Sequence, residues 1–232
     1  MLSPLELPVT VTDEAALLQS TAFIESDATE VIRFAREAVS DAKNDLEKGV
    51  MLYYAVRDEI RYDPYRITLA EDCYRATTVL RERAAYCIPK AVLLTAAARA
   101  VGIPSALGFA DVKNHLTSEK LLQAMGTDLF IYHGYSMLKL DGNWVKATPA
   151  FNLSLCEKFG VKPLEFDGRS DALFHPYDAQ NRRHMEYVNE RGIFADMPFE
   201  EIVSQFQSFY GKFCQQHPTD SSNFEEEKPL EI

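Results

Sequence analysis

The stretch AAYCIPKAVLLTAAARAVGIP, residues 84–104, predicts a long buried helix that a cysteine opens. Pro89 lies in its first turn, where proline is tolerated, and Gly102 follows its end, where glycine is favoured. Between Ile88 and Val101 only three polar side chains interrupt the apolar residues. Such a helix is expected to be buried on most sides, like the central helix of an α+β domain.

Cys87 lies at the positive end of this predicted helix. Unpaired backbone N–H groups and the helix dipole stabilise a thiolate there, and they lower the pKa of a cysteine from about 8.5 toward roughly 3.5 to 7.5. A thiolate is a nucleophile, and its chemistry needs a base within hydrogen-bond reach that a third group orients. The alternative is a structural cysteine, because free cysteines are commonly buried as small apolar side chains.

The composition of the 232-residue chain is that of a globular protein, with 47% hydrophobic and 25% charged residues. We expect one domain over residues 1–215 and a disordered acidic tail over residues 216–232. A net charge of −11 repels polyanions, so nucleic acid is not expected as a partner. The sequence leaves the oligomeric state open.

Targeting and cysteine signals point to a cytoplasmic protein. The N-terminus lacks a basic region followed by a continuous apolar run, and no apolar stretch approaches the ~20 residues that span a bilayer, so no membrane partner is expected. The four cysteines (Cys73, Cys87, Cys156 and Cys214) form no C-x-x-C pair and no cluster with histidine at zinc spacing. Disulfides and a structural metal are therefore not expected.

The stretch FIYHGYSMLKLDGNWVKATPAF, residues 130–151, supplies a candidate base. It predicts two strands joined at Asp141-Gly142, a strong hairpin signal. A two-residue loop puts His133, Tyr135 and Thr148 on one face of the hairpin, whereas a three-residue loop would move Thr148 to the opposite face.

Two polar residues are candidates to orient His133. Thr148 is its diagonal neighbour in the two-residue register, and Asn152 would lie on the same face if the chain stayed extended. The alternative for His133 is an ordinary strand histidine that is satisfied by a neighbouring carbonyl.

These residues resemble the transglutaminase-like superfamily over residues 50–155, approximately. The shared order is a cysteine at a helix start, Gly-Ile-Pro after the helix, a strand with His133 before an aromatic, and a return strand of the form G-x-W-V-x-x-x-P. The resemblance implies a papain-like α+β fold in which the cysteine-bearing central helix packs on an antiparallel sheet. It also implies Cys87 as nucleophile and His133 as base. Where the family commonly has an aspartate before the proline, this chain has Thr148, which carries no charge.

The resemblance implies cysteine-dependent acyl transfer or hydrolysis at amide bonds, without a cofactor. The substrate would be a peptide, a protein or a small amide, and water or an amine would accept the acyl group. Asn152 could replace the aspartate through its amide oxygen, as asparagine does in papain-like proteases. Two alternatives stay open: a weakened or inactive binding module of the same fold, and an enzyme similar to arylamine acetyltransferases that acts on a thioester.

Several further residues are candidates for substrate binding. The backbone N–H of Cys87 is a natural oxyanion donor, with Tyr86 as a wall or second donor. Tyr135 shares the face of His133, and Asp111 and Asn114 fall in a predicted loop that could cover the cleft. The stretch from Leu164 to Tyr187 could build a substrate wall with Asp167, Asp171, His175 and His184, which do not have metal-ligand spacing. The alternative there is a packed C-terminal extension.

The remaining periodicity predicts further helices and strands. Apart from the elements above, these are strands at residues 5–12 and 103–112 and helices at 28–42, 51–60, 73–83, 118–125 and 199–213.

Overall fold

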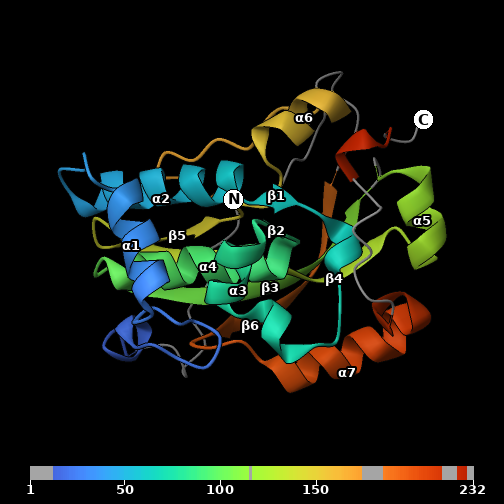
Figure 1. The fold of residues 1–232 in the computed structure, drawn as a ribbon, viewed down its shortest axis with the longest axis horizontal. Helices are drawn as coiled ribbons and strands as arrows, with labels where there is room; N and C mark the ends of the chain where they lie inside the picture. The colour runs from blue at the N-terminus through green and yellow to red at the C-terminus, as the bar shows by residue number, and fades with distance from the viewer. Residues whose placement is uncertain (1–12, 115–116, 174–184, 216–223, 229–232) are drawn as a thin grey trace.

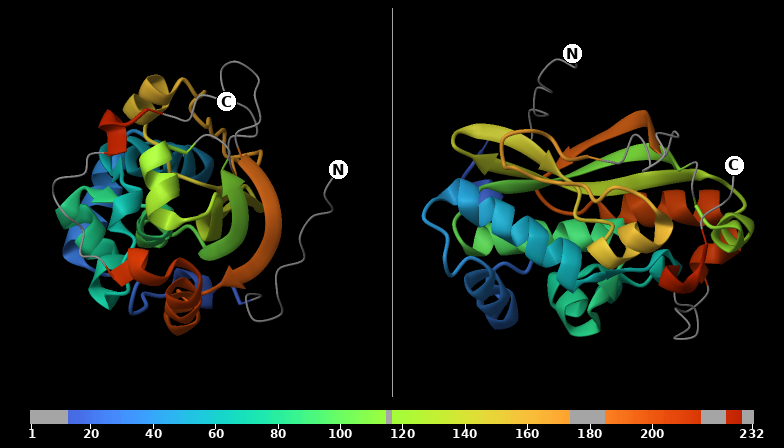
Figure 2. Two further views of the ribbon diagram at one scale, coloured as in Figure 1. Left: turned by 90° about the vertical axis from the view of Figure 1, so that its right-hand side faces the viewer. Right: turned by 90° about the horizontal axis from the view of Figure 1, so that it is seen from above.

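Helix α4 (Cys87–Ala100) runs through the middle of the molecule, with a four-stranded sheet on one side of it (Figure 1). The structure is a computed structural model and describes residues 13–114, 117–173, 185–215 and 224–228. Three helices, α1 (Thr29–Ala38), α2 (Asp45–Glu59) and α3 (Ala76–Glu82), also contact α4. Figure 2 shows the sheet as one layer and these helices as another. Every residue from Cys87 to Arg99 is buried, as the sequence predicted.

The ends of α4 follow from its flanking residues. Tyr86 is extended and supplies no side-chain cap, so the first N–H groups of the helix stay available for other acceptors. Gly102 adopts a φ of +87°, and the N–H of Ile103 donates to the carbonyl of Ala98 at 3.0 Å. This left-handed glycine with a returning hydrogen bond is a common helix stop. The predicted boundaries of the helix are confirmed to within one residue.

The sheet has the order β5-β4-β3-β6, and all its pairs are antiparallel. Its strands are β3 (Ser105–Asn114), β4 (Leu129–Leu140), β5 (Asn143–Ala147) and β6 (Met185–Phe194). The predicted α+β fold with a cysteine-bearing helix on an antiparallel sheet is therefore confirmed.

The hairpin between β4 and β5 has the predicted two-residue loop. Leu140 pairs with Asn143, and both loop residues have positive φ, +47° at Asp141 and +79° at Gly142. These values are typical of the type I′ turn that matches the twist of the strands. Regular pairing ends at Ala147, which pairs with Ser136, so Thr148 lies one residue beyond the ladder.

The other elements surround this core. They are β1 (Arg61–Tyr62) and β2 (Ala84–Ala85), which pair in parallel, the helices α5 (Glu119–Met125), α6 (Leu153–Phe159) and α7 (Phe199–Tyr210), and the 3₁₀ turns η2 (Ala16–Leu18), η3 (Pro64–Arg66), η4 (Glu71–Tyr74), η5 (Gly211–Gln215) and η6 (Phe224–Glu226). Within the described ranges, no helix has the length and apolar character needed to cross a bilayer.

Three features differ from the sequence predictions. Strand β6 and helix α6 were not predicted, and residues 224–228 of the expected disordered tail form a turn in which Phe224 is buried. The pairing partner of β6 is β3, about eighty residues earlier, and this long-range contact has no local sequence signal. The strand predicted at residues 5–12 lies outside the described residues.

Candidate active site

Cys87 is the first residue of α4 and is 6% exposed. Three backbone N–H groups face its thiol and favour the thiolate: its own, that of Ile88 and that of Gly134. The first two are free because no side chain caps the helix, and the third comes from β4. The helix start and the strand therefore meet at the sulfur atom.

Gly134 allows this close approach of helix and strand. A Cβ atom at this position would lie 2.9 Å from the Cα atom of Ile88 and 3.4 Å from its backbone nitrogen. The nearest neighbour is backbone, which cannot rotate away as a side chain could. Gly134 was not predicted as part of the site, although it directly follows His133 in the sequence.

Burial dominates the acidity of the thiol. It raises the pKa of Cys87 to about 11, although the N–H groups of Gly134, Ile88 and Cys87 oppose this shift. The sequence predicted a lowered pKa, and that prediction is wrong for this state of the protein. Burial removes water from around the thiolate, and this destabilises the thiolate more than the N–H groups at the helix terminus stabilise it.

Several buried tyrosines lie near the thiol, and two of them come from β1 and α7. Tyr62 and Tyr210 are 5% and 6% exposed, and both lie close enough to interact electrostatically with Cys87. Burial, and then the charge of Cys87, raise the pKa of Tyr62 well above its ordinary value. The Tyr210 hydroxyl accepts the N–H of Ile131 at 2.8 Å, which fixes α7 against β4. Neither tyrosine has a local sequence signal that would assign it to the site.

His133 lies on β4 directly before Gly134 and is 5% exposed. Because Gly134 faces α4, the alternation of the strand turns His133 and Tyr135 toward its other side. His133 and Thr148 line the same small pocket, whose volume is about 10 Å³. The structure thus brings Cys87 to the backbone beside His133 and brings His133 to Thr148, as the two-residue loop predicted.

Thr148 is held through its backbone. Its N–H donates to the carbonyl of Ala172 at 2.8 Å, and its carbonyl accepts from the Tyr53 hydroxyl at 3.3 Å. Among the described residues its own hydroxyl has no hydrogen-bond partner. A buried hydroxyl beside an imidazole is therefore available to it as a neutral acceptor.

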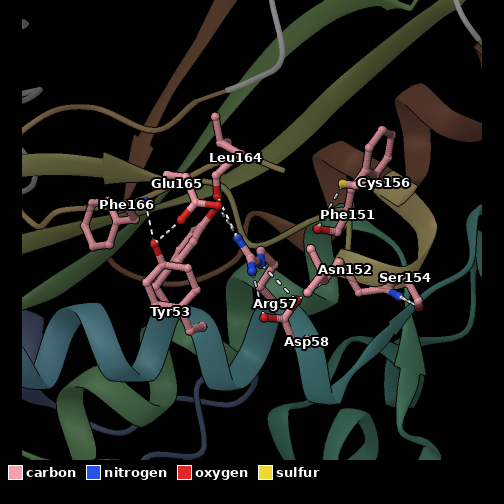
Figure 3. Close-up of polar contacts among 12 residues, drawn as sticks. Tyr53, Arg57, Asp58, Phe151, Asn152, Ser154, Cys156, Leu164, Glu165 and Phe166 are labelled. Carbon is pink, nitrogen blue, oxygen red and sulfur yellow. Dashed lines mark hydrogen bonds and ion pairs between the residues drawn. The ribbon is translucent and has the colours of Figure 1, made fainter. Parts of the chain in front are cut away.

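Helix α2 fixes the segment that follows Thr148. Figure 3 shows Arg57 and Tyr53 projecting from α2 toward Leu164, whose carbonyl accepts from both side chains, at 3.0 and 2.8 Å. Arg57 also binds Asp58 through two hydrogen bonds, and Asp58 accepts the N–H of Leu153 at the start of α6. These contacts hold the segments before and after α6, at Leu153 and at Leu164, against α2.

Asn152 is engaged elsewhere than at His133. Its amide oxygen accepts the N–H of Tyr62 at 2.9 Å, and its NH₂ group donates to Ser154 and Glu225, both at 2.7 Å. The oxygen that was expected to orient the imidazole therefore stabilises β1. The predicted role of Asn152 is not supported by these contacts.

Asp111 and Asn114 lie in β3, so the predicted loop over the cleft is wrong for both of them. The carboxylate of Asp111 is 5% exposed and accepts from Arg191 at 2.8 to 2.9 Å and from the N–H of Tyr132 at 3.1 Å. Tyr132 has a φ of +55°, and the β3–β4 register shifts opposite it. Asp111 thus stabilises an irregular point in the sheet.

The two candidate tyrosines make their contacts outside the pocket of His133 and Thr148. Tyr135 packs on the outer face of the sheet, where its hydroxyl donates to Glu190 and its ring covers Gly108 so closely that a Cβ there would lie 2.1 Å away. Tyr86 packs edge-on against Tyr74 and lines a separate cavity of about 270 Å³. Neither placement supports a role in substrate binding at Cys87.

Lys90, one turn after Cys87, is completely buried. Its ammonium donates to the carbonyls of Arg57, at 2.9 Å, and Ile60, at the end of α2. Burial lowers its pKa well below the ordinary value, and the charge of Asp58 opposes that shift. Lys90 therefore locks the start of α4 onto α2 and fixes the position of the thiol.

The predicted substrate wall is described only in part. Asp167 accepts backbone N–H groups within its own turn, and Asp171 accepts the N–H of Lys146. His175 and His184 lie outside the described residues. In the described ranges, no group of three or more acidic, histidine or cysteine side chains is arranged to hold a metal ion.

Two solved structures are similar to this chain over part of their length. Among solved structures, a chain from Cytophaga hutchinsonii described as a "putative cysteine protease" has a TM-score of 0.47 and 17% identity, over 81% of this chain and 56% of that one. A "putative protease" from Parabacteroides distasonis has a TM-score of 0.41 and 25% identity, over 61% of this chain and 27% of that one. The match therefore spans less than two thirds of the length of each of these two solved chains.

No curated protein matches the sequence. The family model of the transglutaminase-like superfamily matches residues 32–149, which include Cys87, His133 and Thr148. Because this match covers just over half of the 232 residues, the chain belongs to the transglutaminase-like superfamily.

Proposed function

We propose that the protein is a cysteine-dependent enzyme that hydrolyses amide bonds or transfers their acyl groups, with a peptide, a protein or a small amide as substrate. The observation that carries this proposal is the Cys87 thiol at the start of α4, faced by the N–H groups of Cys87, Ile88 and Gly134. Such donors stabilise negative charge on the sulfur and on a carbonyl oxygen bound beside it. We expect the enzyme to work in the cytoplasm.

The proposed reaction starts from a neutral thiol, because the pKa of Cys87 is raised to about 11 by burial. The sulfur of Cys87 attacks the amide carbonyl while His133 takes the thiol proton, and for this step the imidazole has to turn from the pocket that it shares with Thr148 toward the sulfur. The C–N bond of the tetrahedral intermediate then breaks, and His133 returns the proton to the leaving amine. Water or a second amine attacks the resulting thioester, which releases the acyl group and restores the thiol.

The second candidate function is a binding module that keeps the fold without turnover. Thr148 favours it, because this residue occupies the place of the family's aspartate next to His133. A hydroxyl stabilises an imidazolium less than a carboxylate does. The raised pKa of Cys87 favours it as well.

The two functions differ in whether an acyl-enzyme forms. We would mix the full chain with p-nitrophenyl acetate and with a library of peptide p-nitroanilides, quench in acid, and locate the acyl group by peptide mass spectrometry. The enzyme proposal predicts an acyl group on Cys87 in the wild type and none in Cys87→Ala. Cys73→Ser is the matched control, because this half-buried cysteine should not affect the yield.

Acylation that spreads over Cys73 and surface amines, with Cys87 unmodified, would reject the enzyme proposal. Acylation of Cys87 by the ester together with no cleavage of any anilide would limit the activity to activated acyl donors.

A further inference from the structure

The C-terminal turn η6 lies between α5 and α6 (Figure 1). Phe224 is 3% exposed, and its ring packs against three others, with centroid distances of 5.1 Å to Phe159, 6.0 Å to Tyr62 and 6.3 Å to Tyr65. We call these three rings the aromatic cradle. They come from separate elements and enclose one aromatic side chain.

The carboxylate of Glu225 is held on the α6 side of the cradle. It accepts from Asn152 at 2.7 Å and from Ser154 at 3.1 Å, and the ammonium of Lys158 lies 3.6 Å away. Burial alone would raise the pKa of Glu225, but these donors and the Lys158 charge lower it below its ordinary value. The site therefore favours an ionised carboxylate at the position after the aromatic residue.

The carboxylate of Glu227 is held on the opposite side, toward α5. It accepts from the Tyr65 hydroxyl at 2.9 and 3.1 Å and from the Ser118 hydroxyl, and the ammonium of Lys120 lies 3.1 Å away. Two lysines thus flank the cradle in a chain whose net charge is −11. This local charge is complementary to an acidic segment.

The cradle borders the site at Cys87. Tyr62 contributes a ring to the cradle and is also close enough to Cys87 to interact with its charge. Asn152 links β1 to the C-terminal turn, because it accepts the N–H of Tyr62 and donates to Glu225. A segment bound in the cradle therefore contacts a tyrosine that lies near the thiol.

We propose that the cradle and its two lysines form a peptide-binding site for a segment with an aromatic residue followed by carboxylates at the first and third positions after it, and that Phe224–Glu227 occupies it as an internal ligand. Binding stands on these contacts alone. The inference that such segments are the substrate class of Cys87 rests on the proposed function.

The docked segment sets a scale for the affinity. Residues 216–223 connect it to η5, and a short linker gives an effective concentration of millimolar order. The segment stays docked only if its intrinsic dissociation constant is near or below this value. A free peptide of the same sequence should therefore bind an emptied cradle with a dissociation constant of about 1 mM or less.

The test uses the full chain and a fluorescent peptide with the sequence NFEEEK of residues 223–228. The variant Phe224→Ala/Glu225→Gln/Glu227→Gln empties the cradle. In fluorescence anisotropy it should bind the peptide at least about tenfold more tightly than the wild type, in which the internal segment competes. A peptide with alanine for phenylalanine should bind at least about tenfold more weakly, because it loses the burial of one ring.

Two controls distinguish peptide binding in the cradle from nonspecific peptide binding. Phe209→Ala/Glu200→Gln removes an exposed aromatic and a carboxylate from α7 and should behave like the wild type. Adding Lys158→Glu to the emptied variant should weaken binding by about threefold or more. The proposal is overturned if the emptied variant binds no better than the wild type, or if the peptide's phenylalanine does not matter.

Hydrogen exchange provides a readout without any substitution. Several millimolar NFEEEK peptide, added to the wild type, should speed exchange at the amides of residues 224–227, whereas the alanine peptide should not. Unchanged exchange with both peptides contradicts the proposal even if the emptied variant fails to fold. Neither readout needs turnover at Cys87, so the binding site and the proposed function can fail independently.

Discussion

The substitution Gly134→Ala tests how helix α4 is seated on the sheet. The new Cβ would lie 2.9 Å from the Cα atom of Ile88, 3.3 Å from its Cγ1 atom and 3.4 Å from its nitrogen. Because the closest of these atoms belongs to the backbone, relief requires the start of α4 to move away from β4. The side chain added is one methyl group, so the effect is that of overpacking alone.

Overpacking of this kind costs about 1 to 3 kcal/mol of unfolding free energy. For a chain of this size the thermal midpoint should fall by roughly 2 to 12 °C. The movement should also loosen the packing around Cys87. Since burial is the larger influence on that thiol's pKa, we expect the pKa to fall and alkylation of Cys87 to become faster at a given pH.

The assays are urea unfolding and iodoacetamide labelling of Cys87 followed by mass spectrometry. Gly49→Ala is the matched control, because its Cβ would lie 2.8 Å from two flexible side-chain atoms of Leu140, and alanine is favoured in a helix by roughly 0.5 to 1 kcal/mol. If the Gly134→Ala protein has the urea midpoint and the labelling rate of the wild type, helix α4 does not pack against β4 at Gly134 as closely as the structure shows.

Three further predictions follow from buried groups. Asp111→Asn should lower the unfolding free energy by about 1 to 3 kcal/mol, because Arg191 loses its ionic partner; an unchanged urea midpoint would contradict this. The unfolding free energy should fall as pH rises from about 9 to about 11, because Cys87 stays protonated in the folded state after the thiol of the unfolded chain has ionised. Cys87→Ala should reduce the slope of unfolding free energy against pH by up to about 1.4 kcal/mol per pH unit. Equal slopes in urea titrations of both proteins would argue against it. Thr148→Asp should speed acylation of Cys87 by placing a charge beside His133, whereas Thr148→Asn should not, and equal rates in stopped assays would remove Thr148 from the mechanism.

Local signals predicted the parts of the fold that lie close together in sequence. Pro89 and Gly102 mark the ends of α4, and Asp141-Gly142 fixes a two-residue loop and with it the face of Thr148. Each signal acts through the backbone of the residue itself or its immediate neighbours. That is why the helix, the hairpin register and the shared pocket of His133 and Thr148 could be predicted.

Long-range packing accounts for what could not be predicted. Burial raises the pKa of the Cys87 thiol, and the tyrosines that lie near it, Tyr62 and Tyr210, belong to elements far from Cys87 in the sequence. Acidic composition suggested a disordered C-terminus, but Phe224 finds a cradle built from three distant elements. The sequence predicts a loop at Asp111, whereas the residue lies in β3 with an ion pair to Arg191, and no local signal marks a partner eighty residues away.

The most direct test of the central claim is the single-turnover rate at which p-nitrophenyl acetate acylates Cys87, compared between the wild type, His133→Gln and Cys87→Ala. We predict acylation of Cys87 in the wild type, a rate lower by about 100-fold or more without the imidazole, and none without the thiol. The same measurement on Phe224→Ala shows whether the docked segment slows access to the sulfur. Equal rates for the wild type and His133→Gln, or no acylation of Cys87 in either the wild type or Phe224→Ala, would contradict the account.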